Sequence, residues 1–339
     1  MIPINKKTKT ILKFAFVLLI IAIVIYTFRD SAGPIANQLE QTSIWVVVTI
    51  CILAVLYELV EGWITYSFAR KYNPAFTYRM GVESAFYCCF YRVATLGSGA
   101  GVAAIYYLNE KGIEVTKGTG MYMMEYVLHK VTIAIFSGLF FVISWGFMRE
   151  HYSDYTWMLF GGYGITFVVA IIMVLFGCSH HIHEWILWLA DKINKKGKFD
   201  AQIAELRHQC KVMEDATGEL LGKGSFVVSI ILKNLLKFSF WYSIPYFVLC
   251  ETGQITLPEA MAVTSLSVLL AAVIPAPAGI GSTEFVFAML FSVIVGTGAA
   301  GSASLLYRFA TFVLPFIIGA FVVLSRRRIE KQLKKHKHR

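Results

Sequence analysis

The stretch VIPAPAGIGSTEFVFAML, residues 273–290, decides how this chain folds, because it interrupts two strongly apolar segments. Pro275 and Pro277 lack an amide N–H donor and stop a helix. Gly279 and Gly281 allow the backbone to turn sharply. The stretch therefore predicts that one helix ends and another begins inside an apolar region.

The second of these helices is predicted to begin near Glu284, with Ser282 or Thr283 as its N-cap. A helix N-terminus presents free N–H groups and a partial positive charge, which favours an anion. The Glu284 carboxylate can supply that anion as part of the cap. Alternatively, it can lie beside a polar cavity and take up protons, and the sequence leaves both roles open.

The composition places the whole chain in a membrane. Of its 339 residues, 57% are hydrophobic and only 15% are charged, and long runs carry almost no charge. A soluble domain of this size would alternate polar and apolar faces instead. The net charge of +10 lies in short segments between the apolar runs. This distribution indicates membrane orientation and not nucleic-acid binding.

Six apolar runs are long enough to cross a bilayer, and two further runs are broken in the middle. Most Lys and Arg residues lie in the N-terminus, in three loops and in the tail, so both chain ends are predicted to be cytoplasmic. Each broken run then enters and leaves on one face. The predicted spans are 11–28, 43–62, 118–147, 156–177, 225–250 and 302–325.

The fold class predicted is all-α and integral to the membrane, with six full spans and two re-entrant hairpins of opposite polarity. The same order of elements with opposite orientation indicates an inverted-topology repeat. A cytoplasmic segment between the halves has the pattern of amphipathic and interfacial helices, although simple packing explains it equally well. The predicted parts are a first repeat 1–150 with hairpin 81–108, a second repeat 156–325 with segment 178–224 and hairpin 257–295, and a basic tail 326–339.

Ionisable residues inside the apolar runs are candidates for function, because they are costly in hydrocarbon. Cations outnumber carboxylates in this group, whereas Glu58 and Glu61 are interpreted as interfacial. Spare positive charge suits an anionic headgroup, above all a phosphate. The deep residues are Arg92, Lys130, Lys233, Lys237 and Arg308 on one side, and Glu125 and Glu284 on the other, with His129 on the same helix face as Glu125.

Motifs for other chemistry are missing from the sequence. It contains no nucleotide-binding GxxxxGK[ST] motif, no HExxH and no GxSxG. The six cysteines show no CxxC spacing and are interpreted as small apolar residues. We therefore expect neither ATP hydrolysis, nor a metal, nor another cofactor.

Three motifs resemble one family, the lysylphosphatidylglycerol synthase/flippase transmembrane region. They are PAPAGIGSTE at 275–284, YRFATFVLP at 307–315 and FYRVATLGSGAG at 90–101, where the family usually has a more polar or proline-containing break. The resemblance implies a flippase-like fold in which Arg92, Glu284 and Arg308 matter most. It also implies a stand-alone member without synthase activity, since only 14 residues follow the last predicted span.

The function predicted is transport of a phospholipid or a polyprenyl-linked lipid between leaflets of the cytoplasmic membrane. Arg92, Arg308 and Lys237 are the candidate phosphate ligands, with Lys233 and Tyr307 beside them. Two alternatives remain open at this point: secondary transport of a small soluble anion, and a non-catalytic protein that binds a partner. The sequence does not say whether the chain forms homo-oligomers.

Overall fold

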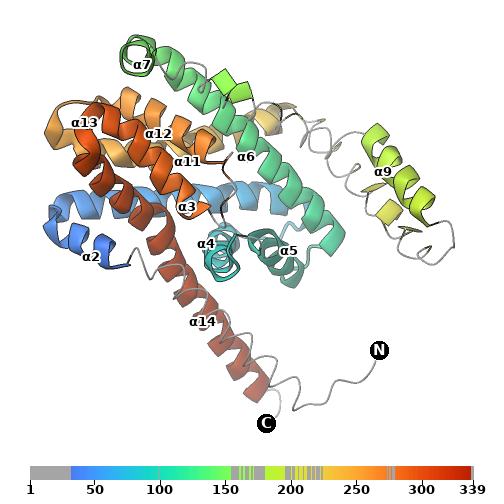
Figure 1. Ribbon diagram of the computed structural model, residues 1–339. Helices are drawn as coiled ribbons and strands as arrows, with labels where there is room; N and C mark the ends of the chain where they lie inside the picture. Colours follow the sequence, from blue (N-terminus) through green and yellow to red (C-terminus); the bar gives the residue numbers. More distant parts are fainter. Residues whose placement is uncertain are drawn as a thin grey trace.

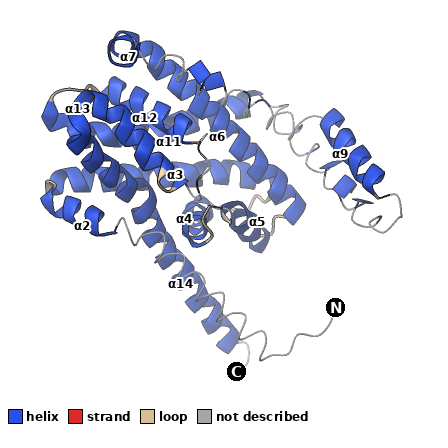
Figure 2. Ribbon diagram, viewed as in Figure 1, coloured by secondary structure: helices blue, strands red, loops and turns tan. Residues whose placement is uncertain are grey.

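The computed structural model describes residues 32–97, 99–153, 180–194, 224–272 and 279–336, with 274, 276 and scattered positions from 160 to 222. Within these residues the protein is all-helical, with eleven α-helices and no strand (Figures 1 and 2). The predicted spans 11–28 and, for the most part, 156–177 lie outside the described residues. So do Pro275, Pro277 and most of the predicted amphipathic helix of segment 178–224.

Four helical segments of the described residues are long and apolar enough to cross a membrane. They are α3 (Ile44–Tyr72), α6 (Val115–Ile143), α11 (Gly224–Leu249) and the segment Ser282–Arg326. The first three confirm predicted spans, although α3 continues ten residues beyond its predicted end at 62. This architecture is that of a multi-pass helical membrane protein.

The first broken run forms two helices, as predicted. Helix α4 (Tyr78–Ala94) and helix α5 (Ala100–Glu110) pack against each other and lie side by side in Figure 1. Thr77 caps α4, since its hydroxyl accepts a hydrogen bond from the Met80 N–H at 3.4 Å. The chain turns at Leu96 and Gly97, whose φ angles are +51° and +93°.

Helix α4 lies between α3 and α14 (Leu314–His336), and glycines allow the close approach. A Cβ added at Gly81 would lie 2.2 Å from the Gly62 carbonyl oxygen of α3. A Cβ added at Gly319 would lie 2.3 Å from the Phe86 carbonyl oxygen. Such small-residue contacts are the usual means of close helix packing in membranes. They hold the first broken run in place against two long helices.

The second broken run is also confirmed as two helices. Helix α12 (Leu257–Ala271) begins with a capping box, in which the Thr256 N–H donates to the Glu259 carboxylate at 2.8 Å. After the break, helix α13 (Ser282–Arg308) begins, and α12 packs against it.

Helix α13 is two arms that fold back on each other at Gly296, which has φ +79° and ψ +163°. In one straight helix, Glu284 and Arg308 would be roughly 36 Å apart at ~1.5 Å per residue. Their charged groups are instead 2.9 Å apart. The second broken run, predicted to end at residue 295, therefore ends there, and the second arm leads into the last candidate span.

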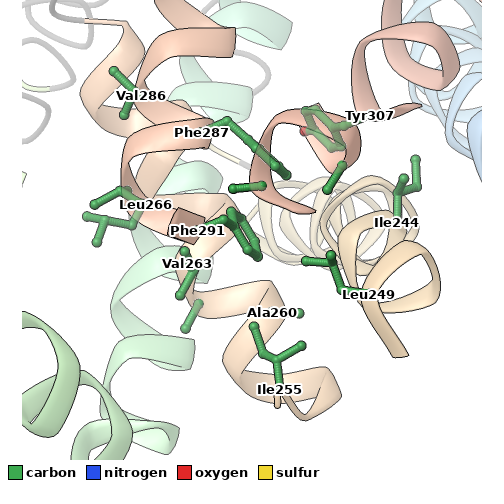
Figure 3. Packing of buried hydrophobic residues seen from close by; sticks show 14 of the residues in the cluster. Ile244, Leu249, Ile255, Ala260, Val263, Leu266, Val286, Phe287, Phe291 and Tyr307 are labelled. Atoms are coloured by element: carbon green, nitrogen blue, oxygen red, sulfur yellow. The ribbon is translucent and has the colours of Figure 1, made fainter. Parts of the chain in front are cut away.

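Apolar side chains of α11, α12 and both arms of α13 form the largest buried cluster (Figure 3). Val263 and Leu266 of α12 pack beside Phe287 and Phe291 of the first arm, and all four are almost fully buried. Tyr307 of the second arm stacks on Phe287, with ring centroids 5.2 Å apart. This cluster fixes the second broken run against a candidate span.

Two predicted loops contain short helices instead, α2 (Ala32–Gln41) and α7 (Trp145–Tyr152). Helix α7 is anchored by the buried Tyr152 hydroxyl, which donates to the Leu290 carbonyl at 2.8 Å. The segment predicted as an interfacial anchor is helical, as α9 (His180–Ile193). It buries His183 and Leu187 and exposes Trp185 and Trp188.

Candidate functional site

A cavity of about 630 Å³ lies among α3, α4, α5 and α6, beside Trp241 of α11 and the end of α12. Its lining is strongly polar for an apolar protein. The polar and charged lining residues are Glu58, Glu61, Thr65, Ser84, Cys88, Arg92, Tyr57, Tyr122, Glu125, Tyr126, His129 and Lys130. A buried space with this many ionisable groups needs water or a polar ligand inside it.

Both helix breaks reach this cavity. Leu96 and Gly97 line it from the first break, and Ala276 and Gly279 line it from the second. Non-helical backbone at membrane depth is tolerated where protein or water surrounds it, and the cavity meets that condition. The two breaks therefore share one polar cavity.

Arg92, a candidate phosphate ligand, lies in the last turn of α4 and lines the cavity. Among the described residues, no carboxylate lies within ion-pair distance of its guanidinium. Lys130 also lines the cavity, with its ammonium group 5.3 Å from the centre of the Tyr126 ring. These two side chains are the cations available to an anion that enters.

Three carboxylates face the same space, and this differs from the prediction. Glu58 and Glu61, interpreted from the sequence as interfacial, both line the cavity, and Glu58 is only 2% exposed. The reason is that α3 extends to Tyr72, which moves both residues to the middle of the helix. Glu125 is the third carboxylate, and it accepts a hydrogen bond from the Thr65 hydroxyl at 3.0 Å.

Lys237 is buried at the edge of the site and does not line the cavity. It is 1% exposed, and its ammonium group lies 2.6 Å from the Glu61 carboxylate. The same ammonium group lies 3.0 Å from Nδ1 of His129, which lines the cavity together with Glu125 as their shared helix face predicts. Lys237 is thus engaged by two protein partners. It neutralises Glu61 and orients His129, where the sequence had suggested a phosphate ligand.

Lys233 lies one turn from Lys237 and does not line the cavity either. Its ammonium group donates to the Ser67 hydroxyl at 2.8 Å and lies 4.6 Å from the centre of the Trp63 ring. This position, near the predicted cytoplasmic end of α3, fits a lysine that extends toward the membrane surface.

Arg308 and Tyr307 are not among the residues that line the cavity, which corrects their assignment as ligands beside Arg92. The Arg308 guanidinium pairs with Glu284 at 2.9 Å and stacks on Phe312, 3.7 Å from the ring centre. Tyr307 is buried against Phe287. Both residues hold the second broken run together from outside the cavity.

Glu284 performs the capping role that the sequence left open. Its second carboxylate oxygen accepts a hydrogen bond from the Gly281 N–H at 2.9 Å, so Gly281 is the N-cap instead of Ser282 or Thr283. Gly279 and Gly281 have φ angles of +69° and +82°, as their predicted turn requires. Ser282 is instead buried, and its hydroxyl has no hydrogen-bond partner among the described residues.

One polar cluster was not predicted from the sequence, because its central residue, Arg326, was assigned to the basic tail. Its guanidinium pairs with Glu83 of α4 at 3.1 Å and with Glu110 of α5 at 2.6 Å. It also lies over the rings of Tyr87 and Tyr107. One side chain of α14 therefore ties the outer ends of both helices of the first broken run.

The electrostatic result is a cavity without spare positive charge. Arg92, Lys130 and the adjoining Lys237 face Glu58, Glu61 and Glu125, so formal charges balance when all are ionised. In the described part of the chain, no group of three His, Cys, Asp or Glu side chains is placed to hold a metal ion.

Residues 10–319 match the sequence model of one family, the lysylphosphatidylglycerol synthase TM region. No match to this chain is found among curated proteins. The family match covers both broken runs, the cavity and every candidate span of the described residues up to α14. The chain therefore belongs to the lysylphosphatidylglycerol synthase transmembrane-region family.

Proposed function

We propose that this protein moves a phosphate-bearing lipid, a phospholipid or a polyprenyl-linked lipid, between the leaflets of the cytoplasmic membrane. The observation that carries the proposal is the cavity, where the Arg92 guanidinium faces the two helix breaks without an ion-pair partner in the described residues. A planar guanidinium matches the oxygens of a phosphate and binds them through two hydrogen bonds. Arg92 is the proposed phosphate ligand, and Lys130 is its neighbour.

The two broken runs act as re-entrant hairpins in this proposal. Helices α4, α5 and α12 have 17, 11 and 15 residues. At ~1.5 Å per residue they reach roughly 26, 17 and 23 Å, less than the ~30 Å hydrocarbon core. Each is therefore short enough to be a half-helix. Two half-helices joined by a break enter the membrane and return on the same face. Together with six spans they form two inverted repeats, 1–150 and 156–325, that rock about the cavity.

A lipid needs a side opening, so that its headgroup enters the cavity while its acyl chains stay in the bilayer. Tyr126 of α6 and Ile274 of the second break support such an opening. Both line the cavity, and both are exposed, by 38% and 42%. A sealed cavity would suit a small soluble anion instead.

The second hairpin is held by residues outside the cavity, and we assign them a mechanical role. The pair formed by Glu284 and Arg308 joins the start of the first arm of α13 to the end of the second arm. The two arms then move as one body. In the rocking cycle this body carries the second break against the first.

The proposed orientation places the N-terminus and the basic tail in the cytoplasm, by the positive-inside bias. The matched family region is the transmembrane part, so the proposed activity is transport and not transfer of lysine. The basic tail meets anionic lipid at the cytoplasmic surface, where each Lys or Arg contributes about 1 kcal/mol.

The test is reconstitution into liposomes with fluorescent phospholipids and polyprenyl phosphates of differing headgroups. We expect headgroup-dependent leaflet exchange that Arg92→Gln abolishes and Arg149→Gln preserves, since Arg149 is exposed on α7 and lies outside the cavity. The same vesicles report uptake of radiolabelled phosphate. Exchange no faster than in empty vesicles across the whole panel, or Arg92-dependent uptake of phosphate alone, would refute lipid transport.

A further inference from the structure

Two carboxylates of the cavity are satisfied by neutral donors only. Glu125 accepts from the Thr65 hydroxyl at 3.0 Å, and Glu58 accepts from the Cys89 thiol at 3.3 Å. Among the described residues, no cation lies within ion-pair distance of either. An ionised carboxylate is costly in a largely buried site where only neutral groups hydrogen-bond to it, and a bound proton lowers that cost.

The other candidates for proton exchange are already engaged. Glu61 pairs with Lys237 at 2.6 Å, and Glu284 pairs with Arg308 at 2.9 Å. The Lys237 ammonium group can only donate hydrogen bonds, so Nδ1 of His129 accepts from it and carries no proton. The His129 imidazole is therefore neutral in this arrangement. Glu125 and Glu58 are the carboxylates of the site that remain able to change charge.

The surroundings of Glu125 determine what its charge would do. Helices α5 and α12 contribute only apolar side chains to the cavity wall, including Ala100, Ala104 and Ala271. The titratable and charged groups that line the cavity with it are Tyr57, Glu58 and Glu61 from α3, Cys88 and Arg92 from α4, and Tyr122, Tyr126, His129 and Lys130 from α6, its own helix. Lys237 of α11 adjoins them through its ion pair with Glu61.

We propose that Glu125, together with Glu58, is a proton-binding site whose occupancy is coupled to phosphate binding at Arg92. The coupling rests on the proposed function, whereas the proton site does not. In the empty cavity, the two ionised carboxylates balance Arg92 and Lys130. A phosphate that binds Arg92 would face the same carboxylates, and each proton taken from water onto a carboxylate oxygen removes one repulsive charge. The proton returns to water when the phosphate leaves.

Linkage makes the coupling reciprocal, so protons must raise phosphate affinity by the same factor by which phosphate raises proton affinity. For a typical coupling, we expect the affinity for a phosphate group to be about tenfold lower at pH ~8 than at pH ~6. The carboxylates are ionised at the higher pH and repel the phosphate, which fixes the sign. With the alternating access of the proposed function, the proton and the lipid would cross together, and the proton gradient would then drive net lipid movement.

The proton site is tested without any transport, by infrared difference spectra of the ligand-free full-length protein in nanodiscs between pH ~8 and ~6, where an ordinary glutamate stays ionised. We expect a protonated-carboxyl C=O band that shrinks in Glu125→Gln and Glu58→Gln but not in Glu114→Gln, whose carboxylate is exposed. Gln keeps the size of Glu and the acceptor for Thr65, so the variant should fold. An unchanged band in Glu125→Gln, or no band in the wild type, overturns the site.

The coupling is tested by calorimetry with glycerophosphoglycerol, a phosphodiester whose own charge is constant in this pH range. Titrations in buffers of differing ionisation enthalpy count protons, and we expect about one taken up per probe bound, lost in Glu125→Gln. Binding of glycerophosphoglycerol without proton uptake overturns the coupling. Tighter binding of glycerophosphoethanolamine without proton uptake also overturns it, because the amine of that probe would then neutralise the carboxylates. An infrared band with no binding of either probe keeps the proton site and refutes the phosphate site at Arg92.

Discussion

The ion pair between Glu284 and Arg308 is predicted to hold the second broken run in its folded-back shape. One carboxylate oxygen of Glu284 lies 2.9 Å from Nε of Arg308, and the other accepts the Gly281 N–H at 2.9 Å. One side chain thus fixes the helix start after the break and ties it to the second arm of α13. Its removal should loosen both.

The energy of the Glu284–Arg308 ion pair follows from the distance between the charged groups and from the exposure of the two side chains. At 2.9 Å and an effective dielectric constant of about 20, the Coulomb energy is roughly 6 kcal/mol. The side chains are 10% and 24% exposed, so screening and lost side-chain freedom reduce this value. Removing one partner of a buried pair costs about 3–5 kcal/mol, because the other charge is left alone. We expect a coupling energy of about 2 kcal/mol for the pair itself.

The assay is a double-mutant cycle on the free energy of unfolding in mixed micelles, followed by tryptophan fluorescence during an SDS titration. Glu284→Gln keeps an acceptor for the Gly281 N–H, so it isolates the charge. Each single variant should lose about 3 kcal/mol, and the double variant with Arg308→Gln should lose about 2 kcal/mol less than the sum. Single effects that add within about 0.5 kcal/mol would show that the pair does not hold the two arms.

Three further variants probe the frame around the cavity. Lys237→Met should lower the free energy of unfolding by about 3 kcal/mol because it leaves the Glu61 carboxylate unpaired, and a second change, Glu61→Gln, should restore part of the loss; no restoration would contradict the pairing. Gly81→Ala should cost about 1–3 kcal/mol by forcing α4 away from α3, whereas Gly138→Ala, with open space around it, should cost nothing; equal effects would refute the close contact. Arg326→Gln should speed hydrogen exchange in α4 and α5 measurably more than in α6, because it frees the outer ends of both helices, and a uniform change would argue against that anchor.

The broken runs could be predicted from the sequence because backbone chemistry is local. Prolines and glycines act on their own residues, so the breaks in 81–108 and 257–295 were visible without any partner. The end of the second hairpin was predicted at residue 295, where the apolar run stops, and the chain folds back at Gly296. Short helices such as α7 could not be foreseen in the same way. Tyr152 anchors that helix through the Leu290 carbonyl, 138 positions away along the chain.

Pairings of charges depend on tertiary contacts, and here the sequence misled. Arg308 and Arg92 are both cations inside apolar runs, but within the described residues only Arg308 forms an ion pair, because the fold-back brings Glu284 to it. Lys237 in turn meets Glu61 across 176 positions. A count of cations against carboxylates along the chain treats these residues alike. Two of the three candidate phosphate ligands were therefore lost to protein partners, and the loss was not readable from spacing.

The position of Glu58 and Glu61 changes the argument about substrate most. Carboxylates near the end of an apolar run are ordinarily interfacial, because hydrocarbon excludes charge. A wet cavity removes that exclusion, so α3 continues past both residues and carries them to mid-helix. An anion in this space then meets carboxylates as well as Arg92. A bound phosphate is favoured if those carboxylates are neutralised. Within the described residues Glu125 and Glu58 have only neutral donors, so a proton is the smallest ligand that can neutralise them.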